Sequence, residues 1–414
     1  MNKLILVGNG FDLAHGLPTS YKDFLNDFWS NFENNLDSSI VKEIIQIDYS
    51  YNGYFNYANN RIESFDDLSS NLKNYCNDDG FIFDDDFFQA RDKLKNIFKF
   101  KNDFFKTINL KNSIENWVDI ENEYYLQLKK IVNLPKLDVS KSDEKQLTFK
   151  KEKILKLNQE FEEVKNLLIK YLREKVIQKF NVEKIATKEE FLKMYDIFKP
   201  NSSLNENVWI EKEFVNKEDQ EHILKIYDKE EKENIKLCES YIVDFNYTGS
   251  TWPYFWETDG SSMMNSNLNT IHGEIDAENF KPVFGFGDEM DEDYQLIENL
   301  DDNEYLKFFK SFQYFQNTCY DGILKFIDNE KFQVCILGHS CGLSDRVMLN
   351  TIFEHENCRS IKIYYFQKEN GTDNYLDVVK NISRHFKDKP SMRRKIVSKE
   401  LSSPLPQNVR FKKK

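Results

Sequence analysis

Short apolar runs of strand length lie near the start of this chain and again after residue 240. The first run, Leu4 to Val7, breaks into two glycines, and a helical pattern begins near Ser20. Buried strands of a parallel sheet are continuous apolar runs, and helices connect one such strand to the next. The pattern therefore predicts one parallel sheet. Its later strands are Tyr241 to Phe245, Val334 to Leu337 and Ile361 to Phe366, and the shorter run Thr270-Ile271 leads into His272.

The long middle of the chain has a different pattern. Between Leu17 and Thr248 only Gly53 and Gly80 occur, so this region needs few left-handed turns. From Ile154 to Tyr171, apolar residues recur at alternating three- and four-residue spacing with Lys and Glu between them. This spacing predicts a long helix with one buried stripe. Packing within the chain is favoured over a dimeric coiled coil, because coiled coils keep the repeat for longer.

Together these patterns predict an α/β fold with a doubly wound, Rossmann-type parallel sheet and a large helical insertion. Helices are also expected at Arg346 to Phe353 and at Tyr375 to His385. We expect residues 1–30 and 236–390 to form a nucleotide-binding domain and residues 31–235 to form a helical insertion domain. The remaining residues, 391–414, are expected to form a basic flexible tail.

Composition narrows the class of protein. Of the 414 residues 40% are hydrophobic, which is enough for a full core. No run reaches the eighteen or so apolar residues of a membrane helix, and the first run is too short for a signal peptide, so we expect a cytoplasmic protein without a membrane partner. The net charge of −13 disfavours nucleic-acid binding. The segment 391–414 holds eight Lys or Arg residues, and a solvated tail is favoured over an RNA-binding arm.

The six cysteines include no Cys-x-x-Cys pair. This spacing argues against a zinc module and against a disulfide scaffold, so no metal site is predicted and reduced thiols are expected.

The turn Gly8-x-Gly10 is the first candidate site. A backbone without Cβ can approach a phosphate closely and present N–H groups to it at the start of a helix. The turn is equally compatible with an ordinary tight connection, because Leu13 replaces the third glycine of the dinucleotide fingerprint. Polar residues also follow the later strands, and ligands of parallel sheets bind beyond the carboxyl ends of strands.

Four ordered motifs carry a family resemblance. The string from Gly8 to Tyr21 resembles the opening motif of the bacteriophage abortive-infection AbiH family, and it is more distantly similar to the glycine loop of sirtuin-like NAD-binding domains. Asp244 to Thr248, Ile271 to Glu274 and Gly338 to Asp345 resemble the later motifs in order and spacing. The resemblance covers the first thirty or so residues and Tyr241 to Phe366, and it implies a sirtuin-like sheet.

The resemblance also implies roles for individual residues. Gly8 and Gly10 would cradle a pyrophosphate, Asn246 would hold the nicotinamide ribose and an attacking water, and His272 would act as general base. Gly338 and Ser340 would meet the ribose or phosphate on the adenosine side. The implied catalytic pair is Asn246 and His272, with His15 and His339 outside it. The implied nucleotide-binding set is Gly8, Asn9, Gly10, Phe11, Asp12, Gly338, Ser340 and Asp345.

Two positions depart from the sirtuin-like pattern. Thr248 stands where those enzymes often carry an acid, and Asp12 stands where their glycine loop usually has a serine. A carboxylate at Asp12 would repel phosphates unless it points to a ribose hydroxyl or to a helix N-terminus.

Two functions of different classes follow from the resemblance. In the first, the chain is an antiphage effector that hydrolyses the N-glycosidic bond of NAD⁺ or a related nucleotide, as an NAD⁺ glycohydrolase does. In the second, it is a nucleotide-binding sensor or partner-binding defence subunit that uses the same pocket without turnover. The expected ligand is NAD, as substrate or bound nucleotide, without a metal. A homo-oligomer and a phage-derived trigger both stay open as partners.

Overall fold

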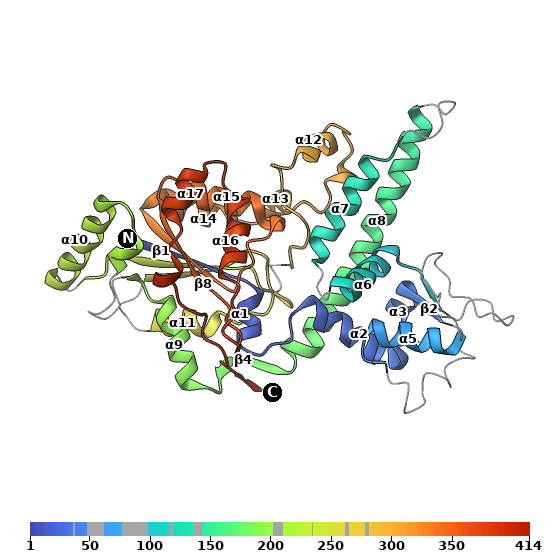
Figure 1. Cartoon of the computed structure of the whole chain (residues 1–414), viewed down its shortest axis with the longest axis horizontal. Helices are drawn as coiled ribbons and strands as arrows, with labels where there is room; N and C mark the ends of the chain where they lie inside the picture. The colour runs from blue at the N-terminus through green and yellow to red at the C-terminus, as the bar shows by residue number, and fades with distance from the viewer. Residues whose placement is uncertain are drawn as a thin grey trace. The chain divides into compact units, whose positions relative to one another are not determined.

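The computed structural model describes residues 1–35, 38–47, 62–76, 98–115, 119–135, 143–201, 210–233, 235–260, 265–277 and 281–414 (Figure 1). Gly53 and Gly80 lie outside these residues. The chain divides into two compact units. The sheet unit consists of Met1–Pro18, Arg173–Tyr294 and Phe309–Lys414, and the helical unit consists of Thr19–Leu172 and Gln295–Phe308.

One five-stranded parallel sheet forms the centre of the sheet unit, with strand order β6-β5-β1-β7-β8. The strands are β1 (Asn2–Val7), β5 (Glu239–Asp244), β6 (Asn265–Thr270), β7 (Phe332–Leu337) and β8 (Cys358–Tyr364). The N-terminal strand lies in the middle, with Leu4 opposite Tyr241 on one side and Val334 on the other. The prediction that the four apolar runs share one parallel sheet is confirmed, and the sirtuin-like details stay a prediction.

Alternate residues of the strands pack into two separate hydrophobic cores. Leu4 and Leu6 of β1 pack in one hydrophobic cluster, whereas Ile5 and Val7 belong to another. Figure 1 shows α14 (Cys319–Asn329), α15 (Arg346–Glu354) and α16 (Tyr375–Ser383) on one side of the strands, with α9 (Lys188–Phe198) and α11 (Trp252–Gly260) on the other. Both faces of the sheet are therefore covered, which explains why every residue of β1 and β7 is buried.

The two helices predicted after the later strands are confirmed as α15 and α16. The other helices and strands of the sheet unit are α1 (Asn9–Ala14), β4 (Phe180–Ile185), α10 (Lys217–Glu233), α13 (Lys310–Gln313), α17 (Lys389–Lys395) and β9 (Phe411–Lys413). A short helix, α12 (Glu292–Glu298), begins in the sheet unit and ends in the helical unit. The predicted insertion ran to residue 235, whereas residues 173–233 pack with the sheet unit where described.

The C-terminal segment differs from the predicted flexible tail. Its last strand, β9, pairs antiparallel with β4, and Val409 and Phe411 are buried. The guanidinium of Arg410 donates to the carbonyl oxygen of Ala14 at 3.0 Å. The prediction of a flexible tail over 391–414 is therefore wrong for this structure. It was based on the high content of Lys and Arg and did not consider the few apolar residues, such as Val409 and Phe411, that pack against the sheet unit.

Helices dominate the second unit, as the scarcity of glycine predicted. They are α2 (Tyr21–Asn35), α3 (Ser39–Ile44), α5 (Phe65–Cys76), α6 (Asp103–Glu115), α7 (Ile120–Val132) and α8 (Asp143–Leu172), with a short antiparallel pair of strands, β2 (Ile45–Ile47) and β3 (Phe98–Phe100). The predicted stripe of α8 from Ile154 to Tyr171 is buried. Within the described ranges, none of the helices combines the length and the apolar character needed to cross a membrane.

Candidate functional site

The candidate residues lie at the carboxyl edge of the sheet. They follow β1, β5, β6 and β7, which are neighbours in the strand order. Backbone hydrogen bonds join the ends of these strands: the N–H of Gly8 donates to Leu337 O at 3.1 Å, and that of Phe245 donates to Val7 O at 2.9 Å. The structure therefore brings the predicted motifs to the edge where ligands of parallel α/β sheets bind.

The glycine turn packs directly on the turn after β7. The N–H of Gly10 donates to Gly338 O at 2.8 Å. A Cβ on Gly10 would lie 2.8 Å from Gly338 Cα, and a Cβ on Gly8 would lie 2.6 Å from His339 Cα. Gly338 itself has φ +67°, which favours glycine. The glycines thus permit two backbone turns to touch, and the N–H groups of Gly8 and Gly10 are already bonded within the protein.

Asp12 is buried and accepts hydrogen bonds from the turn after β5. Its carboxylate accepts from the hydroxyls of Ser250 at 2.5 Å and Thr248 at 2.9 Å, and from the amide of Asn246 at 3.3 Å. Burial raises the pKa of Asp12 to about 7, although the hydroxyls of Ser250 and Thr248 lower it. The carboxylate is therefore bound within the protein and does not face solvent. Thr248 and Asp12, the two residues that depart from the sirtuin-like pattern, are thus hydrogen-bonded to each other.

Asn246 connects the turns after β1 and β5. Its side-chain N–H₂ group donates to Gly8 O at 3.2 Å and to Asp12, and its backbone N–H donates to Asp244 Oδ1 at 2.9 Å. Among the residues described, the side-chain oxygen of Asn246 accepts no hydrogen bond. That oxygen is the atom of this side chain left for a water or a ligand hydroxyl.

A second buried carboxylate, Asp244, lies behind this turn. Its oxygens accept from the Thr251 hydroxyl at 2.6 Å and from the backbone of Asn246. Burial, together with the charge of Asp12, raises the pKa of Asp244 well above its usual range. No Lys or Arg in the described residues forms an ion pair with Asp12 or Asp244. Sequence reasoning missed the hydroxyls of Ser250 and Thr251, which serve as partners instead.

His272 is 4% exposed and has protein atoms near both ring nitrogens. Nδ1 lies 3.2 Å from Phe245 O, while Nε2 lies 3.2 Å from Asp345 Oδ1 and 3.3 Å from the Tyr314 hydroxyl. Burial, aided by the charge of Lys310, lowers the pKa of His272 to about 4, although Asp345 opposes this shift. The ring is therefore neutral near pH 7. With one proton, it can donate to Phe245 O or to Asp345, but not to both.

Asp345 is held by a buried cation rather than facing an open pocket. Lys310 Nζ lies 2.9 Å from Asp345 Oδ1, and His339 Nε2 lies 3.6 Å from Oδ2. Burial alone would raise the pKa of Asp345, but Lys310, with His272 and His339, holds it well below its usual range. The Cys341 N–H donates to His339 Nδ1 at 3.0 Å, so the proton of a neutral His339 ring lies on Nε2, toward the carboxylate.

Sequence reasoning missed Lys310 and Tyr314, and it left His339 outside the catalytic set. The sequence does contain a signal for Lys310, because it lies inside the aromatic run Phe308-Phe309-Lys310-Ser311-Phe312. Such runs are usually buried, and a buried ammonium needs a partner of opposite charge. By contrast, Asn9 and Ser340 of the predicted binding set are exposed at this edge. Across the described ranges, no group of three or more His, Cys, Asp or Glu side chains could hold a metal ion.

A known protein family matches most of the chain. Residues 4–367 match the family model described as bacteriophage abortive infection AbiH. The match begins within β1, includes the helical unit and the whole candidate edge, and ends shortly after β8. No curated protein matches the chain.

Proposed function

Because the chain belongs to the AbiH family of bacteriophage abortive-infection proteins, we propose that it acts in phage defence by hydrolysing a nucleotide at the carboxyl edge of its sheet. The proposed reaction breaks the N-glycosidic bond of NAD⁺ or of a related nucleotide. The observation that carries the proposal is the pair of His272 and Asp345: a neutral, buried imidazole lies 3.2 Å from a carboxylate that stays ionised.

This pair suits the base of a hydrolysis. As the bond from C1′ to the nicotinamide nitrogen breaks, its electron pair leaves with nicotinamide and an oxocarbenium-like centre develops. The oxygen of a water would then bond to C1′, and a water proton would pass to Nδ1 of His272, which must turn away from Phe245 O while Nε2–H stays on Asp345. Asp345 would stabilise the imidazolium so formed, and this attraction is already part of the balance that places the pKa of the ring at about 4. The open amide oxygen of Asn246 would accept a hydrogen bond from the water and so position it.

The phosphates would meet the outer residues of the edge. Gly8 and Gly10 already donate to protein carbonyls, so the exposed Asn9 and Ser340 are the members of the predicted binding set that we expect to contact phosphate or ribose. A single nucleotide would therefore bind across the turns after β1 and β7 and present its C1′ toward the turns after β5 and β6.

The test is release of nicotinamide from NAD⁺ by the purified full chain, with and without phage lysate as a source of trigger. We expect His272→Ala and Asn246→Ala each to lower turnover by about two to four orders of magnitude while affinity changes much less, because positioning and proton transfer act mainly in the transition state. The matched control is His355→Ala, which removes a histidine paired with Asp328 outside the edge. This control should retain wild-type turnover.

One observation favours a second candidate, a nucleotide-binding sensor without turnover. Both ring nitrogens of His272 already have protein partners, and the residue is almost fully buried. A sensor would bind NAD⁺ and release no nicotinamide under any of these conditions, while His272→Ala and Asn246→Ala would still lose protection in phage-challenged cells. That result would overturn the hydrolase proposal for NAD⁺.

A further inference from the structure

The basic C-terminal segment forms one half of an antiparallel ribbon in the sheet unit. β9 pairs with β4, and Lys412 lies opposite Asn181. The backbone N–H of Lys414 donates to Lys179 O at 2.9 Å, which extends the pairing beyond the two strands. We call β4, β9 and the flanking Lys179 and Lys414 the basic ribbon. The proposed reaction uses none of these residues.

Three lysines share one face of the basic ribbon. Directly opposite residues of an antiparallel pair lie on the same face, and the face alternates along each strand. The outer face therefore consists of Lys179, Asn181, Lys412 and Lys414. Phe411 lies on the other face, where it is buried, whereas the three lysines are exposed. The outer face thus presents three ammonium groups from two strands to solvent.

The charges of the outer face are not compensated within the described part of the chain. No carboxylate there forms an ion pair with Lys179, Lys412 or Lys414, and the ammonium of Lys414 donates to Ile177 O at 2.7 Å. Lys179 and Lys414 lie directly opposite each other, and like charges at such positions destabilise a sheet. The arrangement is therefore unfavourable in the free protein, and a polyanion would stabilise it.

The net charge of the chain does not reveal this basic surface. The whole chain has a charge of −13, yet residues 175–185 and 410–414 together hold seven Lys or Arg and one Glu. These two segments are far apart in the sequence, and the pairing of β4 with β9 brings them together. Because phosphate backbones are bound by clustered Lys and Arg, the local charge decides, not the total.

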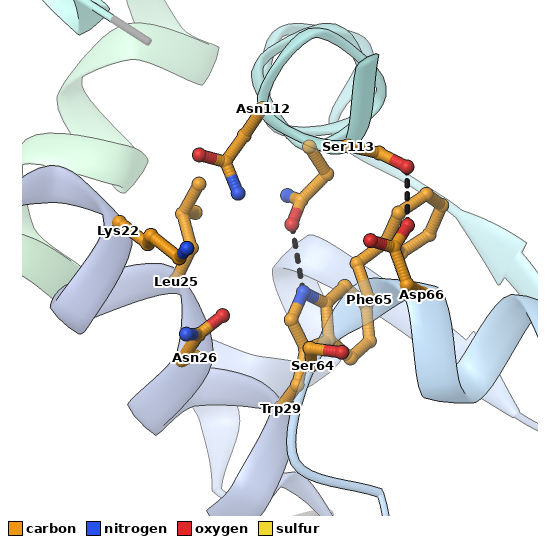
Figure 2. Close-up of a pocket in the computed structure, with 10 residues that line it drawn as sticks. Lys22, Leu25, Asn26, Trp29, Ser64, Phe65, Asp66, Asn112 and Ser113 are labelled. Carbon is orange, nitrogen blue, oxygen red and sulfur yellow. Dashed lines mark hydrogen bonds between the residues drawn. The ribbon is translucent and has the colours of Figure 1, made fainter. Parts of the chain in front are cut away.

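The recess of the helical unit, lined by residues of α2, α5 and α6, has no such excess of positive charge. Its lining includes one cation, Lys22, and one carboxylate, Asp66 (Figure 2). Asp66 accepts a hydrogen bond from the Ser113 hydroxyl, which is also drawn in Figure 2. The formal charges of the recess balance, so it does not attract a polyanion.

We propose that the outer face of the basic ribbon binds the phosphate backbone of a nucleic acid. A lysine ammonium contacts phosphate as a point charge and reads no base, so this binding is independent of sequence. An anionic membrane fits less well, because segments that bind membranes also insert exposed Trp, Phe or Leu side chains. No large apolar residue of the basic ribbon is exposed.

The test is fluorescence anisotropy of a labelled 20-nucleotide single-stranded DNA titrated with the full chain. At about 50 mM salt we expect a Kd below about 100 μM, similar for two unrelated sequences. RNA of the same sequence and the DNA duplex show which form binds best. Lys179→Gln, Lys412→Gln and Lys414→Gln, combined in one chain, should weaken binding at least about tenfold. The slope of log Kd against log salt should fall by about 2, since each phosphate contact on a single strand contributes about 0.7.

The matched control removes three positive charges elsewhere in the sheet unit. Lys217→Gln, Lys225→Gln and Lys229→Gln, combined in one chain, change exposed residues of α10, a helix that also carries many acidic residues. This control should keep the wild-type affinity and the wild-type salt slope, because its lysines are not part of the basic ribbon.

Each outcome decides the proposal. It is overturned if wild type binds none of the three nucleic acids, or if both triple variants lose affinity equally. It is also overturned if wild type binds vesicles with about 30% phosphatidylserine but no nucleic acid. If the ribbon variant fails to fold, Lys412→Gln alone decides through a slope lower by about 0.7. Nicotinamide release is not a readout, so failure of the proposed hydrolysis leaves this test intact.

Discussion

Lys310 Nζ lies 2.9 Å from Asp345 Oδ1, and both side chains are buried at the carboxyl edge of the sheet. The pair acts on His272 in opposite directions: the ammonium lowers the pKa of the imidazole, and the carboxylate raises it. The protonation state of His272 therefore depends on a residue that is 38 positions away in the sequence and on a different element.

The first prediction concerns this cation. Lys310→Met should lower the free energy of unfolding at pH 7 by about 3–5 kcal/mol, because it leaves Asp345 buried without its main counter-charge. The pKa of His272 should rise, since one of the groups that lower it is gone. Urea unfolding measures the first effect, and NMR titration of the histidine ring measures the second.

Lys325→Met, on the exposed surface of α14, is the control for loss of one positive charge. It should change stability by less than about 0.5 kcal/mol. If Lys310→Met and Lys325→Met have equally small effects, the ion pair with Asp345 does not stabilise the edge.

The second prediction concerns Asp12. Its folded-state pKa is about 7, above the usual value near 4, so the folded state holds a proton more tightly than the unfolded state between these values. Its contribution to stability is therefore present at low pH and is lost as the pH rises through about 7. Asp12→Asn lacks this titration. Relative to wild type, the variant should gain about 1–3 kcal/mol on going from pH 5 to pH 8.

Urea unfolding of both proteins at the two pH values checks this difference. The comparison between proteins is needed because His272 contributes the opposite slope: its folded pKa of about 4 makes stability rise with pH between about 4 and 6.5. A wild-type minus variant difference that stays constant from pH 5 to pH 8 would show that Asp12 is ionised throughout.

The third prediction tests the packing role of the glycine turn. Gly10→Ala places a Cβ 2.8 Å from Gly338, so the two turns must separate, which should cost about 1–3 kcal/mol. Gly342→Ala meets nothing closer than the Ser340 hydroxyl at 3.5 Å and has φ −70°, so its stability should be near wild type. Thermal unfolding ranks the two variants. If Gly10→Ala unfolds at the wild-type temperature, the turn tolerates a Cβ and its glycines need another explanation.

The sheet and the order of the motifs were predictable because they depend on local pattern. Apolar runs such as Leu4 to Val7 mark strands buried on both faces, and residues after such strands must come together at one edge. The partners of Asp345 were not predictable in this way. Lys310 reaches the edge from a short helix that follows the segment Gln295–Phe308 of the helical unit, and no spacing rule relates it to His272.

The role of Gly8 and Gly10 also could not be predicted from the sequence alone. The same turn can present its N–H groups to a phosphate or to a neighbouring carbonyl, and only the position of Gly338 distinguishes these cases. At the C-terminus, composition misled the prediction, because a few buried residues such as Val409 and Phe411 decide whether a basic segment folds.

The last prediction tests that C-terminal anchor. Phe411 stacks on His15 with ring centroids 4.9 Å apart, and it is 4% exposed. His15 Nδ1 lies 2.7 Å from Phe11 O, so the contact supports the helix that follows the glycine turn. Phe411→Ala should therefore lower the free energy of unfolding by about 3–5 kcal/mol, whereas Lys413→Ala, an exposed residue of the same strand, should change it by less than about 0.5 kcal/mol.

Urea unfolding measures both variants, and limited proteolysis locates the effect. Loss of the ring should release β9 from β4 and expose the basic residues after Arg410 to trypsin, while the core around β7 stays protected. If Phe411→Ala is as stable and as resistant to trypsin as Lys413→Ala, then β9 does not anchor the segment. That result would support the sequence-based prediction of a solvated basic tail.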